Sequence, residues 1–139
     1  MADATGKADR FLHSTKTKYE LRFGYSRAVR HGGVVRVAGT AGLDESGNPV
    51  PGGVVAQARR ALEIVRRALE DLGASLEDVV MTRVYVSDVT NIESVAVVHG
   101  DVFRDIRPAA TIVRVDFIDP RILVEIEAEA VYRGADARR

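Results

Sequence analysis

Three glutamates near the end of the chain, Glu125, Glu127 and Glu129, alternate with apolar residues. This alternation predicts a strand in which the three carboxylates lie on one face, at intervals of roughly 7 Å. A carboxylate beside a like charge has a raised pKa, and a raised pKa suits a side chain to act as a general acid or base. Glu125 is therefore a candidate catalytic residue, although it could equally be one rung of a structural ladder of glutamates and arginines.

The arginines that could pair with these glutamates alternate with apolar neighbours in other predicted strands: Arg36, Arg83 and Arg114. Two interpretations of the charged face remain open. It is either a solvated outer face, with ion pairs worth about 0–1 kcal/mol each, or a subunit interface in which the charges pair or line a central channel. The residue pattern alone favours the solvated face, because runs of charge are usually solvated.

Several kinds of chemistry are excluded by residues that the chain lacks. It has no cysteine, which excludes disulfides, thiol nucleophiles and thiolate metal sites. Its only lysines are Lys7, Lys16 and Lys18, so the body of the chain has no amine for a Schiff base. The histidines have no metal-binding spacing, and no Gly-x-Gly-x-x-Gly motif predicts dinucleotide binding. We therefore expect neither a metal nor a cofactor.

The composition indicates a single soluble domain. The chain has 139 residues, of which 46% are hydrophobic, and its 20 basic residues balance 20 acidic ones. Zero net charge argues against a nucleic-acid-binding surface, although the arginines could still cluster locally. No apolar stretch is long enough to cross a bilayer, and residues 1–18 lack the apolar core of a signal peptide. We expect a cytoplasmic protein that does not associate with membranes.

The periodicity of apolar residues predicts two helices. The stronger one covers 55–72, where apolar residues recur at spacings of three and four, and Gly73 follows it as a C-cap. The second helix is predicted to begin at Thr90, which forms a capping-box pattern with Glu93. His99 lies on its apolar stripe, where a histidine is more often packed and hydrogen-bonded than a ligand.

Strands are predicted over 21–29, 34–38, 79–87, 111–117 and 122–132. The order β-β-α-β-α-β-β indicates an α+β domain with its helices on one face of a mixed sheet. Residues 1–18 are predicted to be a flexible leader, which only Phe11 and Leu12 could dock, and residues 134–139 a polar tail. The domain itself is expected to cover residues 19–133.

Seven short motifs occur in order along the chain: Gly24-Tyr25-Ser26-Arg27-Ala28-Val29, Val37-Ala38-Gly39-Thr40, Gln57-Ala58-Arg59, residues 73–80, residues 84–88, Arg107-Pro108-Ala109-Ala110-Thr111 and Val124-Glu125-Ile126-Glu127-Ala128. Together they resemble the Rid family, the reactive intermediate deaminases of the YjgF type, over about residues 23–132. The resemblance implies a chorismate-mutase-like fold and a homotrimer with ligand clefts between neighbouring subunits. Catalytic members hydrolyse reactive enamines and imines, such as 2-aminoacrylate, to keto acids and ammonia. Some relatives have been labelled endoribonucleases.

The resemblance also implies which residues form the site. The cleft tyrosine of the family matches Tyr25, its strand-end glycine matches Gly39, and its water-holding glutamate matches Glu125. On this basis the expected ligand-binding residues are Tyr25, Gly39, Thr40, Ala110 and Thr111, with Glu125 as the catalytic residue.

One position departs from the pattern of the family. The arginine that grips the substrate carboxylate in deaminases aligns with Ala110, and the usual serine and cysteine align with Ala38 and Ile112. A methyl group cannot replace the two charge-assisted hydrogen bonds of a guanidinium. The chain therefore looks like a member of an arginine-lacking branch with a non-standard substrate. Three hypotheses follow: an imine or enamine hydrolase, a non-catalytic trimer that binds a small molecule and, as the weakest, an endoribonuclease.

Overall fold

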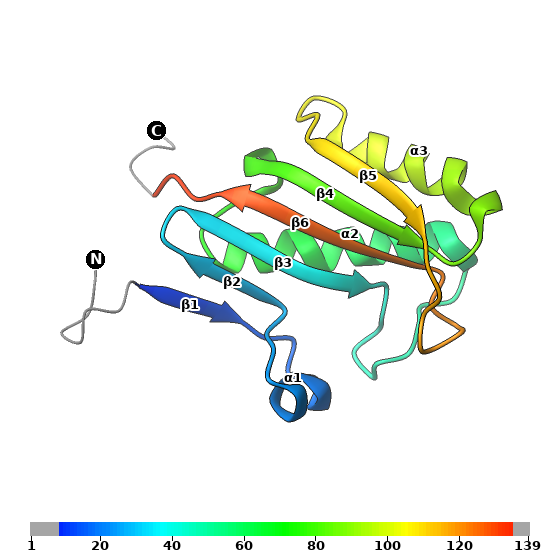
Figure 1. Cartoon of the computed structure of the whole chain (residues 1–139), viewed down its shortest axis with the longest axis horizontal. Helices are drawn as coiled ribbons and strands as arrows, with labels where there is room; N and C mark the ends of the chain where they lie inside the picture. The colour runs from blue at the N-terminus through cyan, green and yellow to red at the C-terminus, as the bar shows by residue number, and fades with distance from the viewer. Residues whose placement is uncertain (1–8, 135–139) are drawn as a thin grey trace.

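A six-stranded sheet with helices on one face makes up the fold of residues 9–134, which the computed structural model describes (Figure 1). The elements in chain order are β1 (Arg10–His13), α1 (Lys18–Phe23), β2 (Ala28–His31), β3 (Val34–Ala41), α2 (Gly53–Asp71), η1 (Leu76–Asp78), β4 (Val79–Val86), η2 (Val89–Asn91), α3 (Ile92–Phe103), β5 (Ala109–Arg114) and β6 (Val124–Val131). The strands lie in the order β1-β2-β3-β6-β4-β5. Strands β4 and β5 are parallel and all other neighbours are antiparallel, so the predicted α+β fold with a mixed sheet is confirmed.

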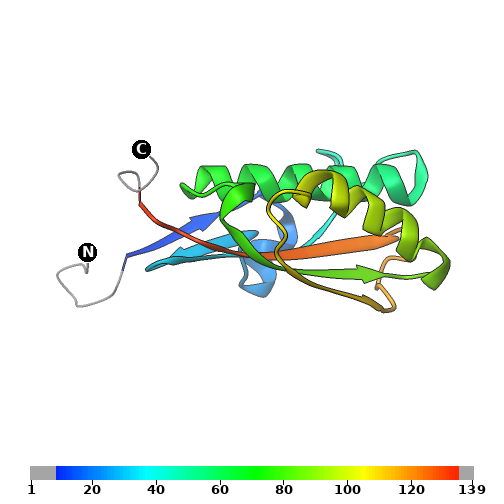
Figure 2. The ribbon, with the colours of Figure 1, turned by 90° about the horizontal axis from the view of Figure 1, so that it is seen from above.

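Helices α2 and α3 cover the same face of the sheet (Figure 2). The apolar stripe of α2 is buried against the sheet, with Leu62, Val65 and Leu69 in one core with Val84 and Ile126. Its opposite side carries arginine–glutamate pairs at a spacing of four residues, which suit a solvated helix surface. Within residues 9–134, no helix is long and apolar enough to cross a membrane.

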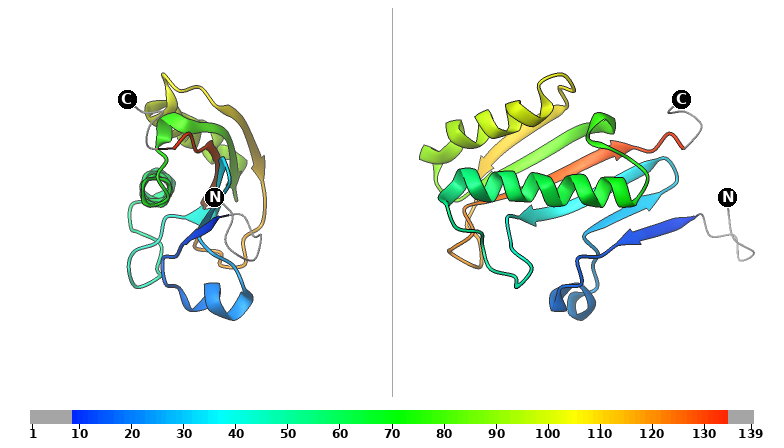
Figure 3. Two further views of the ribbon diagram at one scale, coloured as in Figure 1. Left: turned by 90° about the vertical axis from the view of Figure 1, so that its left-hand side faces the viewer. Right: turned by 180° about the vertical axis from the view of Figure 1, so that it is seen from behind.

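Strand β6 lies between β3 and β4 and has two chemically different faces. Its apolar residues, including Val124, Ile126 and Ala128, are buried under the helices. Glu125, Glu127 and Glu129 alternate with them and are half-buried, so they lie on the opposite face of the sheet. Figure 3 shows that α2 and α3 leave this second face of the sheet uncovered. We call this second face of the sheet the outer face.

Strand β3 contains a β-bulge opposite β6. Val37 pairs with Ala128 and Thr40 pairs with Ile126, so residues 38 and 39 together lie opposite the single residue Glu127. The extra residue keeps both Val37 and Thr40 on the core side, where Thr40 is only 1% exposed. Bulges redirect side chains and are common next to active sites.

The described part of the predicted leader contains a strand. Strand β1 pairs antiparallel with β2, and the Arg30 guanidinium carbon lies 4.2 Å from the centre of the Phe11 ring. The prediction of a flexible leader is therefore wrong for Arg10–His13, because this segment completes the sheet beyond β2. Residues 1–8 of the leader and 135–139 of the tail lie outside the described residues.

The first predicted strand is also partly wrong, since Lys18–Phe23 forms α1 and β2 begins at Ala28. The Glu20 carboxylate accepts hydrogen bonds from the backbone N–H and the hydroxyl of Thr17, both at 3.1 Å, which caps the helix. Gly24 ends it with a positive φ of 73°. The Thr-x-x-Glu pattern of a capping box was present in the sequence, but the alternating apolar residues after it suggested a strand.

The start of α3 differs from the prediction in detail. Helix α3 begins at Ile92 after the short turn η2, and the carboxylate of Asp88 accepts a hydrogen bond from the Thr90 N–H at 2.9 Å. Aspartate is a strong N-cap residue and here caps η2, whereas Asn91 at the N-cap of α3 makes no side-chain capping hydrogen bond, so α3 does not begin with the predicted capping box of Thr90 and Glu93. The predicted C-cap Gly73 follows α2 with a φ of 85°.

Candidate functional site

Four of the predicted site residues come together at the β3 bulge. Tyr25 precedes β2, Gly39 lies in the bulge and Thr40 directly follows it, and Glu125 lies on β6 in register with Ala41. A Cβ atom built on Gly39 would lie only 2.7 Å from Oε1 of Glu125, so the glycine leaves the space that this carboxylate occupies. With Arg27, described next, these residues form what we call the Glu125 cluster.

Arg27 joins the members of the Glu125 cluster. Its Nη1 donates hydrogen bonds to the Gly39 carbonyl oxygen at 2.5 Å and to Oγ1 of Thr40 at 3.2 Å. The Tyr25 ring centre lies 5.8 Å from its guanidinium carbon. Sequence reasoning did not single out Arg27 as a site residue, although its position two residues after Tyr25 in the same motif was a usable signal.

Backbone contacts also fix the position of Arg27. Its carbonyl oxygen accepts from the Ala38 N–H at 2.9 Å, and its own N–H donates to Oε1 of Glu20 at 3.2 Å. Burial by itself raises the pKa of the Glu20 carboxyl, but hydrogen bonds from Thr17 and its neighbours outweigh burial and lower the pKa overall. Glu20 is therefore an ionised, buried anchor between α1 and the start of β2.

Thr40 supports the bulge from the core side. Its hydroxyl donates to the Ala38 carbonyl oxygen at 2.7 Å and accepts from Arg27. Because its side chain is buried, Thr40 contributes to the arrangement of the Glu125 cluster through the backbone shape of β3.

Glu125 has an environment suited to proton transfer. Burial raises the pKa of its carboxyl, the positive charge of Arg27 opposes this rise, and the negative charge of Glu127 adds to it. A carboxyl that retains its proton to higher pH than an ordinary glutamate can donate it to a substrate and take one back from water.

The remaining glutamates of the outer face have partners within the chain. The Tyr85 hydroxyl donates to Oε1 of Glu127, and this hydrogen bond is the largest cause of a raised pKa at Tyr85. Arg36 Nε lies 2.9 Å from one oxygen of Glu129, and Arg83 Nη2 lies 3.5 Å from the other. Two of the three predicted arginine partners therefore bind the same glutamate, and the contact we find for Glu127 is with a tyrosine.

Ala110 and Thr111 lie away from the Glu125 cluster in the same chain. They belong to β5, and β4 separates β5 from β6, so β5 and β6 lie about 10 Å apart at the usual strand spacing. Ala110 pairs with Thr82, which is buried on the helix side, so the two residues share the face opposite Glu125. Thr111 is in register with Arg83 and hence with Glu127.

His99 is packed and hydrogen-bonded, as its place on an apolar helix stripe suggested. Its Nε2 lies 2.8 Å from the Thr82 hydroxyl, its ring lies against Phe103, and burial lowers its pKa. Within residues 9–134, no group of three or more histidine, aspartate or glutamate side chains is arranged to hold a metal ion.

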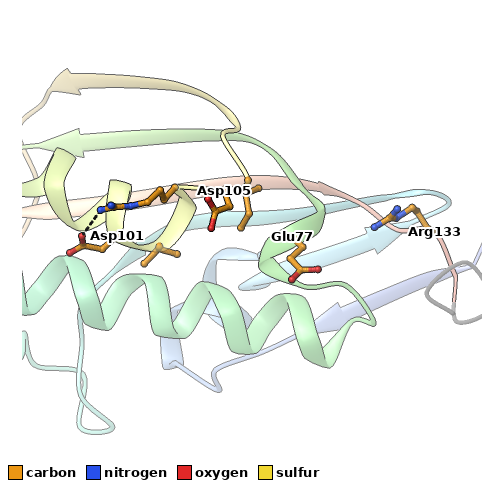
Figure 4. Close-up of a pocket in the computed structure, with 7 residues that line it drawn as sticks. Glu77, Asp101, Asp105 and Arg133 are labelled. Carbon is orange, nitrogen blue, oxygen red and sulfur yellow. Dashed lines mark ion pairs between the residues drawn. The ribbon is translucent and has the colours of Figure 1, made fainter.

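A separate hollow of about 570 Å³ lies at the C-terminal end of α3 (Figure 4). It is lined by Glu77, Asp101, Val102, Arg104, Asp105, Ile106 and Arg133. Several of its charges already pair with each other or with neighbours, since Arg104 lies 3.6 Å from Asp101 and Arg133 lies 2.9 Å from Asp78. Its lining includes no residue of the Glu125 cluster and no predicted site residue.

Comparison with known proteins adds an independent line of information. The family model described as Endoribonuclease L-PSP matches residues 15–132, which include the whole Glu125 cluster. A RutC family protein of Pyrococcus abyssi is 36% identical over 107 residues, covering 76% of this chain and 84% of that protein. The crystal structure of Rv2704 from Mycobacterium tuberculosis, a member of the YjgF/YER057c/UK114 family, has a TM-score of 0.80 and 43% identity, covering 88% of this chain and 99% of that chain. The structure of E. coli TdcF with bound serine has a TM-score of 0.70 and 26% identity, covering 77% and 87%.

Proposed function

This chain belongs to the Endoribonuclease L-PSP family, and on that premise we propose that it hydrolyses a small reactive imine or enamine at the Glu125 cluster. The observation that carries the proposal is the half-buried carboxyl of Glu125, whose pKa is raised by burial and which sits against the backbone of Gly39. A proton-transfer group suits hydrolysis of a C=N bond, because the reaction moves protons from water to the nitrogen.

The proposed reaction needs one water and no other co-reactant. The carboxyl of Glu125 donates its proton to the imine nitrogen and takes one from the water as the water oxygen bonds to the imine carbon, which leaves a carbinolamine. Glu125 then donates a proton to the amine nitrogen as the C–N bond breaks and ammonia leaves, and it takes the carbinol O–H proton as the carbonyl forms. Both protons of the water thus reach the nitrogen, and Glu125 returns to its starting protonation state.

In the proposed assembly, a second copy of the chain completes the cleft, and three copies form a homotrimer. The outer face supports this, because exposed Val34, Val113 and Val131 lie on the same side of the sheet as the half-buried glutamates. An interface between copies would remove these apolar side chains from water, which is favourable. Strand β5 is an edge strand that exposes Ala110 and Thr111, so a neighbouring β5 could approach the Glu125 cluster.

The proposed substrate differs from that of arginine-containing deaminases. Ala110 offers no guanidinium for a carboxylate, so a substrate bound only through that position would lack its strongest anchor. Serine is bound in the E. coli relative TdcF, which supports a small-molecule ligand of similar size. The same departure at position 110 favours, as the second candidate, a trimer that binds such a ligand without turning it over.

The test is keto-acid and ammonia formation from imines generated in situ by an amino-acid oxidase. The wild type should raise the rate of keto-acid and ammonia formation above the uncatalysed rate. Glu125→Gln should lower the catalysed rate by about 100-fold or more, as expected for the loss of a general acid or base. Glu129→Gln is the matched control, since Glu129 lies on the same strand and face but pairs with Arg36 and Arg83. Ligand binding without acceleration would support the non-catalytic trimer, and cleavage of single-stranded RNA without imine hydrolysis would support a nuclease.

A further inference from the structure

The guanidinium of Arg27 has one engaged side and one unpartnered side. Nη1 is used twice within the protein, by the Gly39 carbonyl and the Thr40 hydroxyl. Nε is buried and has no hydrogen-bond partner, and Nη2 has no such partner among residues 9–134. Because Nε and Nη2 form the side-on edge of the guanidinium, their N–H groups point in parallel, as a bidentate fork.

No carboxylate of the described chain fills this fork. The charge of Arg27 acts on the pKa of Glu125, so the two side chains lie near each other. Among residues 9–134, however, Arg27 forms no ion pair with Glu125 or with another carboxylate. Glu20 contacts the backbone N–H of Arg27. A buried donor without a partner is costly, and more so on a charged group, so this edge is suited to a group that arrives from outside the chain.

We propose that the Nε–Nη2 edge of Arg27 binds a carboxylate of the ligand, which makes Arg27 the specificity-determining residue of the Glu125 cluster. The inference deepens the proposed function, on which the choice of ligand class rests. The planar fork matches a carboxylate in geometry and charge. The two hydrogen bonds of Nη1 hold the guanidinium in a fixed orientation, so ligand binding costs little side-chain entropy at Arg27.

A carboxylate fits this position better than a phosphate. A phosphate group carries about −1.5 to −2 charges at neutral pH, and it would lie beside the half-buried Glu125. A carboxylate carries a single charge and meets less repulsion there. The neighbouring ring of Tyr25 is 41% exposed and can change rotamer as a ligand reaches the fork.

The assignment also gives the departure at position 110 a chemical consequence. Ala110 belongs to the edge strand β5 and faces the helix side, whereas Arg27 contacts the bulge next to Glu125. A carboxylate bound by Arg27 would therefore enter the Glu125 cluster from the side of β2 and Tyr25. Carboxylate recognition is then kept in this chain, but from a different direction and by a different residue.

Binding of pyruvate and of its uncharged analogue pyruvamide tests the proposal without any need for turnover. In the wild type, pyruvate should bind more tightly, and Arg27→Gln should weaken pyruvate by about 10- to 100-fold, the range for a hydrogen-bonded charged group, while leaving pyruvamide unchanged. Arg27→Lys should retain part of the affinity, because it keeps the charge and loses the fork. Arg36→Gln, at an exposed arginine paired with Glu129, should change neither ligand.

A second measurement needs no variant. The Nε–H resonance of Arg27 in the wild type should shift on addition of pyruvate and stay in place with pyruvamide. The proposal would be overturned if Arg27→Gln weakened the binding of pyruvate and pyruvamide equally. It would also be overturned if the wild type did not bind pyruvate more tightly than pyruvamide, or bound neither. Pyruvate binding that depends on Arg27 in a protein without imine hydrolysis would instead refute the proposed function and leave this inference standing.

Discussion

Replacing Gly39 by alanine should impair the Glu125 cluster while leaving the fold almost intact. The new Cβ would lie 2.7 Å from Oε1 of Glu125, and an ordinary contact begins at 3.4 Å, so the carboxylate must move by about 0.7 Å. Nothing else near the new methyl group is rigid, because the next atom is the carboxyl carbon of the same side chain at 3.9 Å. The whole steric cost therefore falls on the catalytic candidate.

The stability effect of Gly39→Ala should be small because two terms oppose each other. Moving Glu125 off its rotamer costs about 0.5–1.5 kcal/mol. Replacing a strand glycine by alanine gains about 0.5–1 kcal/mol, since the unfolded chain loses freedom. The net change is within about 1 kcal/mol, which corresponds to a shift in Tm of roughly 4 °C or less for a chain of this size. Displacement of a reacting group by nearly 1 Å can lower activity by about 100-fold.

Gly42→Ala is the matched contrast. A Cβ at Gly42 would overlap the backbone of Gln57 in α2, including its carbonyl oxygen, with the Gln57 Cα only 2.6 Å away. A helix backbone cannot move as a side chain can, so we expect a loss of about 3 kcal/mol, typical of severe overpacking.

The assay for this pair is a melting curve for each variant together with keto-acid release from oxidase-generated imines. The expected pattern is a nearly unchanged Tm with low activity for Gly39→Ala and a large fall in Tm for Gly42→Ala. A Gly39→Ala protein with full activity, or one that loses as much stability as Gly42→Ala, would refute the argument that Gly39 exists to make room for Glu125.

Five further outcomes are expected from the described contacts and the proposed trimer. Glu125→Gln should raise the Tm at neutral pH, because the pKa of Glu125 is higher in the folded state and the wild type therefore loses stability as pH rises from the ordinary glutamate range through that raised pKa. Below about pH 4 the carboxyl is protonated in both states and the gain should vanish, so an equal gain at both pH values would contradict the argument. Tyr85→Phe should lower the Tm by roughly 3–5 °C, because it loses a hydrogen bond worth about 1 kcal/mol. Glu127→Gln should lower the pKa of the Tyr85 phenol in an ultraviolet titration, and an unchanged pKa would show that the Tyr85–Glu127 hydrogen bond is absent in solution. Arg36→Ala should cost less than about 1 kcal/mol in a denaturant titration, because Arg36 is exposed and its pair with Glu129 is solvated, and a larger loss would refute this description of the pair. Sedimentation should give a species of three 15.1 kDa chains, and a stable monomer at micromolar concentration would refute the proposed trimer.

Most of the sheet and both long helices were predictable because their residues obey simple periodicities. The apolar stripe of α2 and the alternation in β6 are each buried on the side that the pattern predicts. The N-terminal segment was misjudged because β1 has only two apolar residues and gains its place by pairing with β2, a long-range contact that no local pattern announces. The helix α1 did carry a local signal, the capping box of Thr17 and Glu20, which alternating apolar residues obscured.

The candidate site was predictable only in part for a different physical reason. Tyr25, Gly39 and Glu125 could be named from motifs, but the bulge that brings Gly39 against Glu125 depends on a one-residue register shift between β3 and β6. That shift sets which donors reach which acceptors, and hence the role of Arg27. The distance of Ala110 from this cluster likewise depends on strand order, since β4 lies between β6 and β5.

The central claim is that Glu125 is a proton-transfer group tuned by its surroundings, and its own titration tests this most directly. Following the carboxyl carbon of Glu125 by NMR, with Glu125→Gln to assign the signal, should give a pKa above that of Glu129 on the same face, whose pKa is lowered mainly by its hydrogen bond from Arg36. In Arg27→Gln the pKa of Glu125 should rise further, because a positive charge that opposes the effect of burial has been removed. A Glu125 that titrates like an exposed glutamate in the wild type, and is unaffected by Arg27→Gln, would contradict the account.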